Sequence, residues 1–304
     1  MFSRNLRLEA SPADQYDKSS KPAVVRRIPL WLWPNILSLD APVIAIVWQS
    51  FFAACFGIRI DAVSLAFLGV GVWIAYAGDR ILDGVGKKPL QETARHRFAR
   101  VNRGVLTALI GLAVPIVLLL SWRLSARPIF RGYLAVGIAV AAYFAIVHLA
   151  SEKLRRHWPK ELVVGLLFAC GTCAPFLRAS VIRFDRLPAI ILFAAVLWVN
   201  AVAIQCWEAG HERRARLRFK PKITGLAAYH LGGAAIAVGI AALVMFKLSG
   251  AASARPLYAA IALTAGLLEA QELARGRLSR EALRVLADTA LLTPLIFVLL
   301  AAAG

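Results

Sequence analysis

The chain carries nine apolar stretches, each long enough to cross the hydrocarbon core of a bilayer as a helix, which takes about 20 residues. Only 17% of its 304 residues are charged, in short blocks between these stretches, and 60% are hydrophobic. A soluble domain carries about 25% charge and fewer apolar residues. The pattern therefore predicts an all-α integral membrane protein. The nine predicted membrane helices cover residues 35–57, 60–82, 104–122, 132–150, 160–178, 188–207, 224–246, 255–271 and 284–303.

The polar stretches are too short to form a second, soluble domain. We expect an N-terminal tail over residues 1–33 and one transmembrane domain over residues 34–304. The tail is polar and basic, and it lacks an apolar core like that of a signal peptide. Its end, residues 28–33, holds two tryptophans, which suit the headgroup layer of a membrane.

The basic residues predict the orientation. Of the 36 Lys and Arg residues, 27 fall in the N-terminal tail and in every second connection, and 9 fall in the others. Because Lys and Arg concentrate on the cytoplasmic side, we place the N-terminus inside and the C-terminus outside, in the cell membrane. The net charge of +19 is spread over these connections and lines no single helix face. It therefore favours membrane lipid and anionic ligands over nucleic acid.

Two pairs of acidic residues stand at the cytoplasmic ends of the second and sixth predicted helices. Asp79 and Asp83 are four residues apart, and so are Glu208 and Glu212, which puts each pair on one helix face. Four predicted helices separate the two pairs. The spacing predicts two four-helix halves followed by a ninth helix.

Four carboxylates facing one another would form a site for a divalent cation. Oxygen ligands favour Mg²⁺, which also binds substrate phosphates. Arg80 and Lys153, with the nearby Arg155 and Arg156, offer donors for further phosphate oxygens. The combination predicts a diphosphate-bearing lipid as ligand. Acidic residues at helix ends can also be solvated interfacial residues paired with Arg, and this alternative stays open.

Several segments, taken in order, resemble the UbiA family of membrane prenyltransferases. The resemblance covers about residues 35–300. It is carried by Ala75-Tyr-Ala-Gly-Asp79-Arg-Ile-Leu-Asp83-Gly84 at the first Asp-rich motif, Glu208-xxx-Glu212 at the second, Leu39-Asp-Ala-Pro42 at the start of the first helix, Lys153–Leu162 as a basic connection, and Gly165–Gly171 in a Gly-rich fifth helix.

This resemblance implies a nine-helix bundle with a central cavity. It implies transfer of a prenyl group from a polyprenyl diphosphate to a lipophilic, often aromatic, acceptor. Asp79 and Asp83 would hold one Mg²⁺, and Glu208 and Glu212 a second. The diphosphate would contact Lys153, Arg155 and Arg80.

The chain departs from the family pattern in both motifs. Ala75 and Tyr76 stand where the first motif has Asn and Asp, and Glu replaces Asp twice in the second. These departures favour an alternative function, a catalytically degenerate relative that binds an isoprenoid, quinone or pigment without turnover. A transporter is a third possibility, although transporter sites lie near the midplane of the membrane.

Other residues admit two interpretations each. Asp288 follows Arg284 by four residues, which favours an ion pair between them over cavity lining. Asp40 fits either a helix cap or the cavity, and Asn200 either a helix–helix hydrogen bond or a substrate contact. His211 completes one ExxH pattern, but a di-iron site needs a second. Aromatic residues near the acidic pairs suit either cation–π contacts or packing: Trp73, Tyr76, Trp198 and Trp207.

Overall fold

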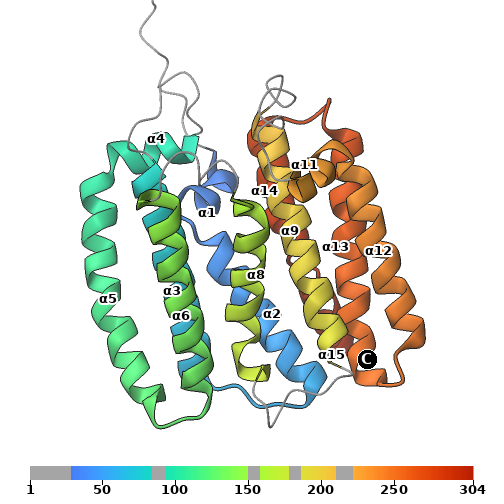
Figure 1. Cartoon of the computed structure of the whole chain (residues 1–304), viewed down its shortest axis with the longest axis horizontal. Helices are drawn as coiled ribbons and strands as arrows, with labels where there is room; N and C mark the ends of the chain where they lie inside the picture. The colour runs from blue at the N-terminus through green and yellow to red at the C-terminus, as the bar shows by residue number, and fades with distance from the viewer. Residues whose placement is uncertain (1–28, 84–93, 150–157, 178–185, 210–221, 304) are drawn as a thin grey trace, which may run out of the picture.

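The computed structural model describes residues 29–83, 94–149, 158–177, 186–209 and 222–303, and every regular element within these ranges is a helix. The long helices run side by side in one bundle, with α1, α4 and α11 at the same end, here called the α4 end (Figure 1). In chain order the elements are η2 (Leu30–Leu32), α1 (Trp33–Ile36), α2 (Asp40–Phe56), α3 (Ala62–Asp83), α4 (Ala94–Val101), α5 (Arg103–Ser125), α6 (Ile129–Leu149), α8 (Lys160–Cys173), η4 (Ala174–Phe176), α9 (Leu187–Ala209), α11 (Lys222–Tyr229), α12 (Leu231–Leu248), η6 (Ala252–Ala254), α13 (Arg255–Ala274), α14 (Arg280–Ala290) and α15 (Pro294–Ala303).

Five of the described helices are long and apolar enough to cross a membrane: α3, α5, α6, α9 and α12. Two bent helix pairs raise the number to seven if each pair is one span. The all-α membrane class predicted from the sequence is thus supported. Each of the nine predicted stretches coincides with a helix or a helix pair, but α8 has only 14 residues, and α13 carries two Glu. Nine spans in two four-helix halves remain a prediction.

Each bent pair breaks at a residue that disrupts a regular helix: Ser38 in the first and Pro294 in the second. The segments Leu30–Ile36 and Asp40–Phe56 meet at 78°, and Ser38 between them has a left-handed φ of 60°. The segments Arg280–Ala290 and Pro294–Leu300 meet at 48°. Proline lacks an N–H and is tolerated in the first turn of a helix, so Pro294 begins α15 after the break. The second break lies against the middle of α2, since Trp48 Nε1 donates to the Leu291 carbonyl at 2.7 Å.

The buried core follows α9, and the outer helices expose apolar side chains. Over an apolar stretch of 18 residues in each helix, 56% of the residues are buried in α9 and 11% in α5. Phe193 of α9 packs on Trp48 with ring centroids 4.4 Å apart. Exposed large apolar residues cover α5, α12 and α15. A soluble protein rarely exposes so large an apolar surface to water, whereas lipid chains can cover it.

A close crossing joins α8 to α9 through Gly165. A Cβ atom at this position would stand 2.9 Å from the backbone nitrogen and 3.1 Å from the Cα of Trp198. Backbone atoms in a helix cannot swing aside as a flexible side chain can. Glycine is therefore what lets these two helices approach, as small residues do in membrane bundles.

Candidate functional site

A polar cavity of about 340 Å³, here called the polar chamber, lies at the α4 end. Its walls come from α2, α3, α4, α8, α9 and α14. Asp79 of α3 and Glu208 of α9 both line it, so these two predicted site residues are brought together. The side chain of Asp83 lies outside the described residues, as do Glu212, Lys153, Arg155 and His211.

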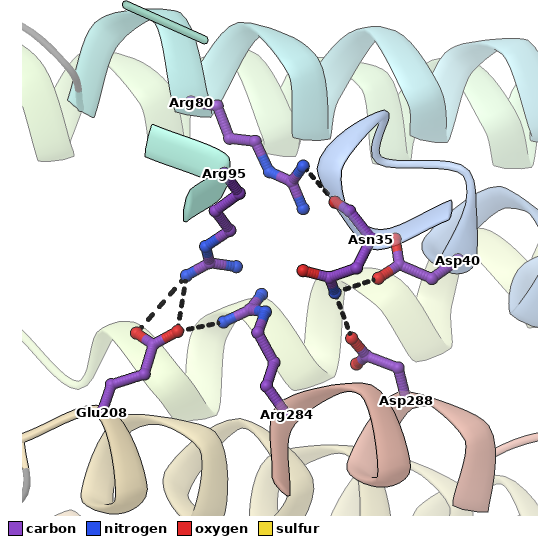
Figure 2. Close-up of polar contacts among 7 residues, drawn as sticks. All are labelled: Asn35, Asp40, Arg80, Arg95, Glu208, Arg284 and Asp288. Carbon is purple, nitrogen blue, oxygen red and sulfur yellow. Dashed lines mark hydrogen bonds and ion pairs between the residues drawn. The ribbon is translucent and has the colours of Figure 1, made fainter. Parts of the chain in front are cut away.

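Glu208 is held by two guanidinium groups. Its Oε1 lies 3.0 Å from Arg95 Nη2 of α4 and 2.6 Å from Arg284 Nη1 of α14 (Figure 2). The side chains of Arg95 and Arg284 are only 13% and 14% exposed. The Nε atom of each arginine is buried and has no hydrogen-bond partner among the residues that the structure describes. Glu208 thus ties α4, α9 and α14 together across the chamber.

Arg80 lines the chamber and is also buried, with 5% exposure. Its Nη1 donates to the carbonyl of Asn35 and, at 2.9 Å, to that of Ile36. These carbonyls end α1, where helical donors run out; that of Asn35 also accepts a 3.3 Å bond from Ser38 N. Arg80 therefore stabilises the break after α1. Its predicted contact with a diphosphate stays a prediction.

Asn35 joins two carboxylates on the other side of the chamber. Its Nδ2 donates to Asp40 Oδ2 at 2.6 Å and to Asp288 Oδ2 at 2.9 Å (Figure 2). The side chain thereby links α1, α2 and α14. Asp288 lines the chamber and receives the Asn35 amide, whereas Arg284 pairs with Glu208, not with its helical neighbour. Asp40 lines the chamber as well.

Removing this bridging amide is expected to destabilise the bundle. In Asn35→Ala the two partly buried carboxylates lose a shared donor, which costs about 1–3 kcal/mol. We expect Tm in detergent to fall by about 5 °C. Asn102→Ala is the matched control, because the amide of Asn102 donates only to the Phe98 carbonyl at the α4–α5 corner. An equal Tm for the two variants would contradict the role of Asn35.

Asp79 stands at the edge of the chamber with an unsatisfied oxygen. Its Oδ1 is buried and accepts no hydrogen bond from the described part of the chain. Among the described residues, His148 Nε2 lies 3.7 Å and Lys160 Nζ 3.9 Å from this oxygen. Both distances exceed hydrogen-bond length, so this oxygen can still accept from a ligand or a water.

An apolar pocket of about 310 Å³ adjoins the chamber between α3, α5, α6 and α8. Its lining is aromatic and aliphatic, with Phe67, Tyr133, Tyr143 and Phe144 among the rings. The pocket and the chamber share wall residues: Tyr76, Asp79, Val164 and Phe168. The two cavities therefore adjoin along a common wall that includes Asp79. Together they offer a charged compartment for a head group beside an apolar compartment for a chain.

Aromatic residues noted in the sequence fall into two groups. Tyr76 lies where the chamber meets the pocket, edge-on to Phe168 with centroids 6.3 Å apart. Trp73 donates to the Leu37 carbonyl at 3.0 Å, and Trp207 to Glu272 at 2.6 Å. Asn200 lines the chamber and donates to the Ala287 carbonyl at 2.8 Å, the helix–helix bond considered above.

The described residues do not by themselves fit the predicted Mg²⁺ sites. No three His, Cys, Asp or Glu side chains converge within the part of the chain that the structure describes. Glu208 already faces two cations, and Asp79 faces Lys160. The Mg²⁺ prediction therefore depends on Asp83 and Glu212.

Sequence reasoning passed over Asn35, Arg95 and Arg284 as site residues. Asn35 carries no charge, and the two arginines lie among many basic residues near the same predicted membrane face. The one available signal was that Arg284 and Asp288 share a helix face. That signal was assigned to a local ion pair.

No family model, no curated protein and no solved structure matches this chain. Its class follows from the fold and the cavity alone. The described chain is an all-helical protein with five to seven helices able to span a membrane, and a charged chamber opens beside an apolar pocket.

Proposed function

We propose that this protein transfers a prenyl group from a polyprenyl diphosphate to a lipophilic acceptor in the cell membrane. The observation that carries the proposal is the junction of the two cavities at Tyr76 and Asp79. A prenyl diphosphate has the same division, a highly charged head joined directly to an apolar chain. The α4 end would face the cytoplasm, as the basic connections predict.

The chamber residues suit the head group. Lys160, Arg95 and Arg284 line it and can donate to phosphate oxygens. When the bond between the allylic carbon and the diphosphate oxygen breaks, the oxygen keeps both electrons. Fixed cations close to that oxygen stabilise the developing charge.

The pocket residues suit the prenyl chain and the reactive carbon. Aliphatic and aromatic walls exclude water, which would otherwise capture an allylic cation. The rings of Tyr76 and Phe168 stand where the head meets the chain, and an aromatic face attracts a cation. The acceptor then bonds to the allylic carbon and gives up a proton.

Mg²⁺ is part of the proposal through the resemblance of the Asp-rich motif. When bound, it would neutralise charge on the diphosphate. Asp79 offers it one unsatisfied carboxylate oxygen. The further ligands would have to come from Asp83 and Glu212.

A second candidate is a lipid-binding protein that holds an isoprenoid, quinone or pigment without turnover. The observation in its favour is Glu208, whose carboxylate is taken up by Arg95 and Arg284. Ala75 lines the apolar pocket and offers no ligand atom.

One experiment separates the two candidates. The protein is placed in lipid nanodiscs with prenyl diphosphates of graded length, a membrane lipid extract as the acceptor source, and Mg²⁺. Prenylated product together with diphosphate release well above empty nanodiscs supports transfer. An isoprenoid that copurifies with the protein, without release, supports binding alone. If neither prenylated product nor copurified lipid is found, both candidates are overturned.

A further inference from the structure

Two arginines stand where the family resemblance expects the second divalent cation. Glu208 occupies the position of a metal ligand, yet it contacts Arg95 at 3.0 Å and Arg284 at 2.6 Å. Two guanidinium groups carry the same total charge as one Mg²⁺, and arginine stays protonated at any physiological pH. This half of the chamber has its positive charge built into the chain.

The arginines also have unused donors. A guanidinium offers five N–H groups, and the Nε of both arginines is buried without a partner. An unpaired buried donor next to a charge costs free energy, so it favours a ligand with acceptor oxygens. Both side chains line the chamber, and Figure 2 shows them approaching Glu208 from different elements.

Among the other charged residues of the chamber, Asp79 faces Lys160 at 3.9 Å, and three more have partners of their own. Asp40 and Asp288 share the amide of Asn35, and Arg80 donates to backbone carbonyls. Glu208 is therefore the carboxylate with which an incoming anion would compete for the two arginines. Planar guanidinium groups bind phosphate oxygens in pairs, which gives them an advantage over a single ammonium group.

We infer that Arg95 and Arg284 bind the anionic head of the lipid directly, so that the Glu208 half of the chamber works without a divalent cation. This inference rests on the proposed function for the identity of the lipid, a prenyl diphosphate. The family resemblance implies that a metal ion supplies the positive charge beside Glu208. Here the two arginines supply it. The anion displaces Glu208 as the shared partner of the two arginines, or joins it there.

The test is a binding measurement that requires no turnover. The probe is a prenyl thiolodiphosphate, whose C–S bond resists ionisation, added to the full-length protein in nanodiscs with either EDTA or Mg²⁺. Wild-type protein is expected to bind the probe in EDTA, with a Kd at most about tenfold above that in Mg²⁺, since only the Asp79 half would lose a cation. Arg95→Gln and Arg284→Gln are each expected to weaken binding about tenfold in EDTA.

Arg275→Gln is the matched control. Arg275 also pairs with a glutamate, Glu272 at 2.6 Å, but is 53% exposed and does not line the chamber. Its Kd is expected to equal that of the wild type. The double variant Arg95→Gln with Glu208→Gln is a second control. It removes the carboxylate that the single change would leave short of a partner, so weaker binding by the double variant cannot be attributed to misfolding caused by that carboxylate.

The ligand series separates the sources of the anion. A prenol of equal chain length is expected to bind at least tenfold more weakly, and inorganic diphosphate also more weakly than the lipid. Binding that needs Mg²⁺, or that is unchanged in both arginine variants, would overturn the inference. So would a prenol, or free diphosphate, that binds as tightly as the lipid. Absence of prenyl transfer would count against the proposed function only.

Discussion

Asp79→Asn is expected to lower prenyl transfer about 100-fold while the protein stays folded, a loss typical of removing one charged group at a reacting centre. The carboxylate lies at the junction of the chamber and the pocket, near Lys160 at 3.9 Å and His148 at 3.7 Å. Asparagine keeps the size but not the charge. Lys160 and His148 would then lose the carboxylate that faces them and holds them beside the leaving oxygen.

Asp61→Asn provides the control for this change. Asp61 also stands at the end of a long helix and pairs with a basic residue, Arg127, but it lies at the start of α3, away from the chamber. Its Oδ1 accepts from Ser64 N at 2.8 Å, a cap that asparagine can keep. Activity within about twofold of wild type is expected for this control. Equal activity of the Asp79 and Asp61 variants would contradict the assignment of the site.

Gly165→Leu is expected to prevent assembly of the bundle. The new side chain would begin 2.9 Å from the backbone of α9 at Trp198, and neither helix can yield without separating. Overpacking of a core costs about 1–3 kcal/mol even where side chains can move, and here the obstacle is backbone. We expect the yield of monodisperse protein after detergent extraction to fall at least tenfold, measured by fluorescence-detected size exclusion.

Gly111→Leu tests whether this loss is specific to the crossing. Gly111 lies on the exposed face of α5, and a Cβ there would meet nothing within 4 Å. Leucine is a better helix former than glycine and suits a lipid-facing position, so the yield is expected to be unchanged. A similar yield for both variants would show that α8 and α9 do not cross as closely as described.

The membrane-capable helices could be predicted from the sequence because apolar length is a local property. Stretches such as 104–122 and 188–207 coincide with α5 and α9. The breaks before α2 and before α15 were less visible. Proline marks both regions, but the direction of a bend depends on contacts with other parts of the chain, such as that of Leu291 with Trp48 of α2.

The chamber could be predicted only in part. Acidic residues near a membrane face are rare, so Asp79 and Glu208 stood out, and they do line one cavity. Their partners did not stand out, because basic residues fill every connection on the predicted cytoplasmic side. Arg95 meets Glu208 across 113 positions of sequence. No local spacing encodes such a pair.

Asp288 shows how a local rule can fail. A spacing of four residues favours an ion pair with Arg284 in an isolated helix, worth a few tenths of a kcal/mol. In the bundle both side chains face the chamber. There Glu208 and Asn35 offer buried partners, and the local pair is replaced.

The central claim is that one amphipathic ligand fills the chamber and the pocket together. The most direct test is photolabelling with a prenyl diphosphate that carries a diazirine at the far end of its chain, followed by mass spectrometry of the peptides. The account predicts labels on α3 and α6 around Phe67 and Tyr133, at the end of the pocket away from Asp79, and their loss when unlabelled prenyl diphosphate is added. Labels confined to the outward faces of α5 and α12, and unaffected by that competitor, would contradict it.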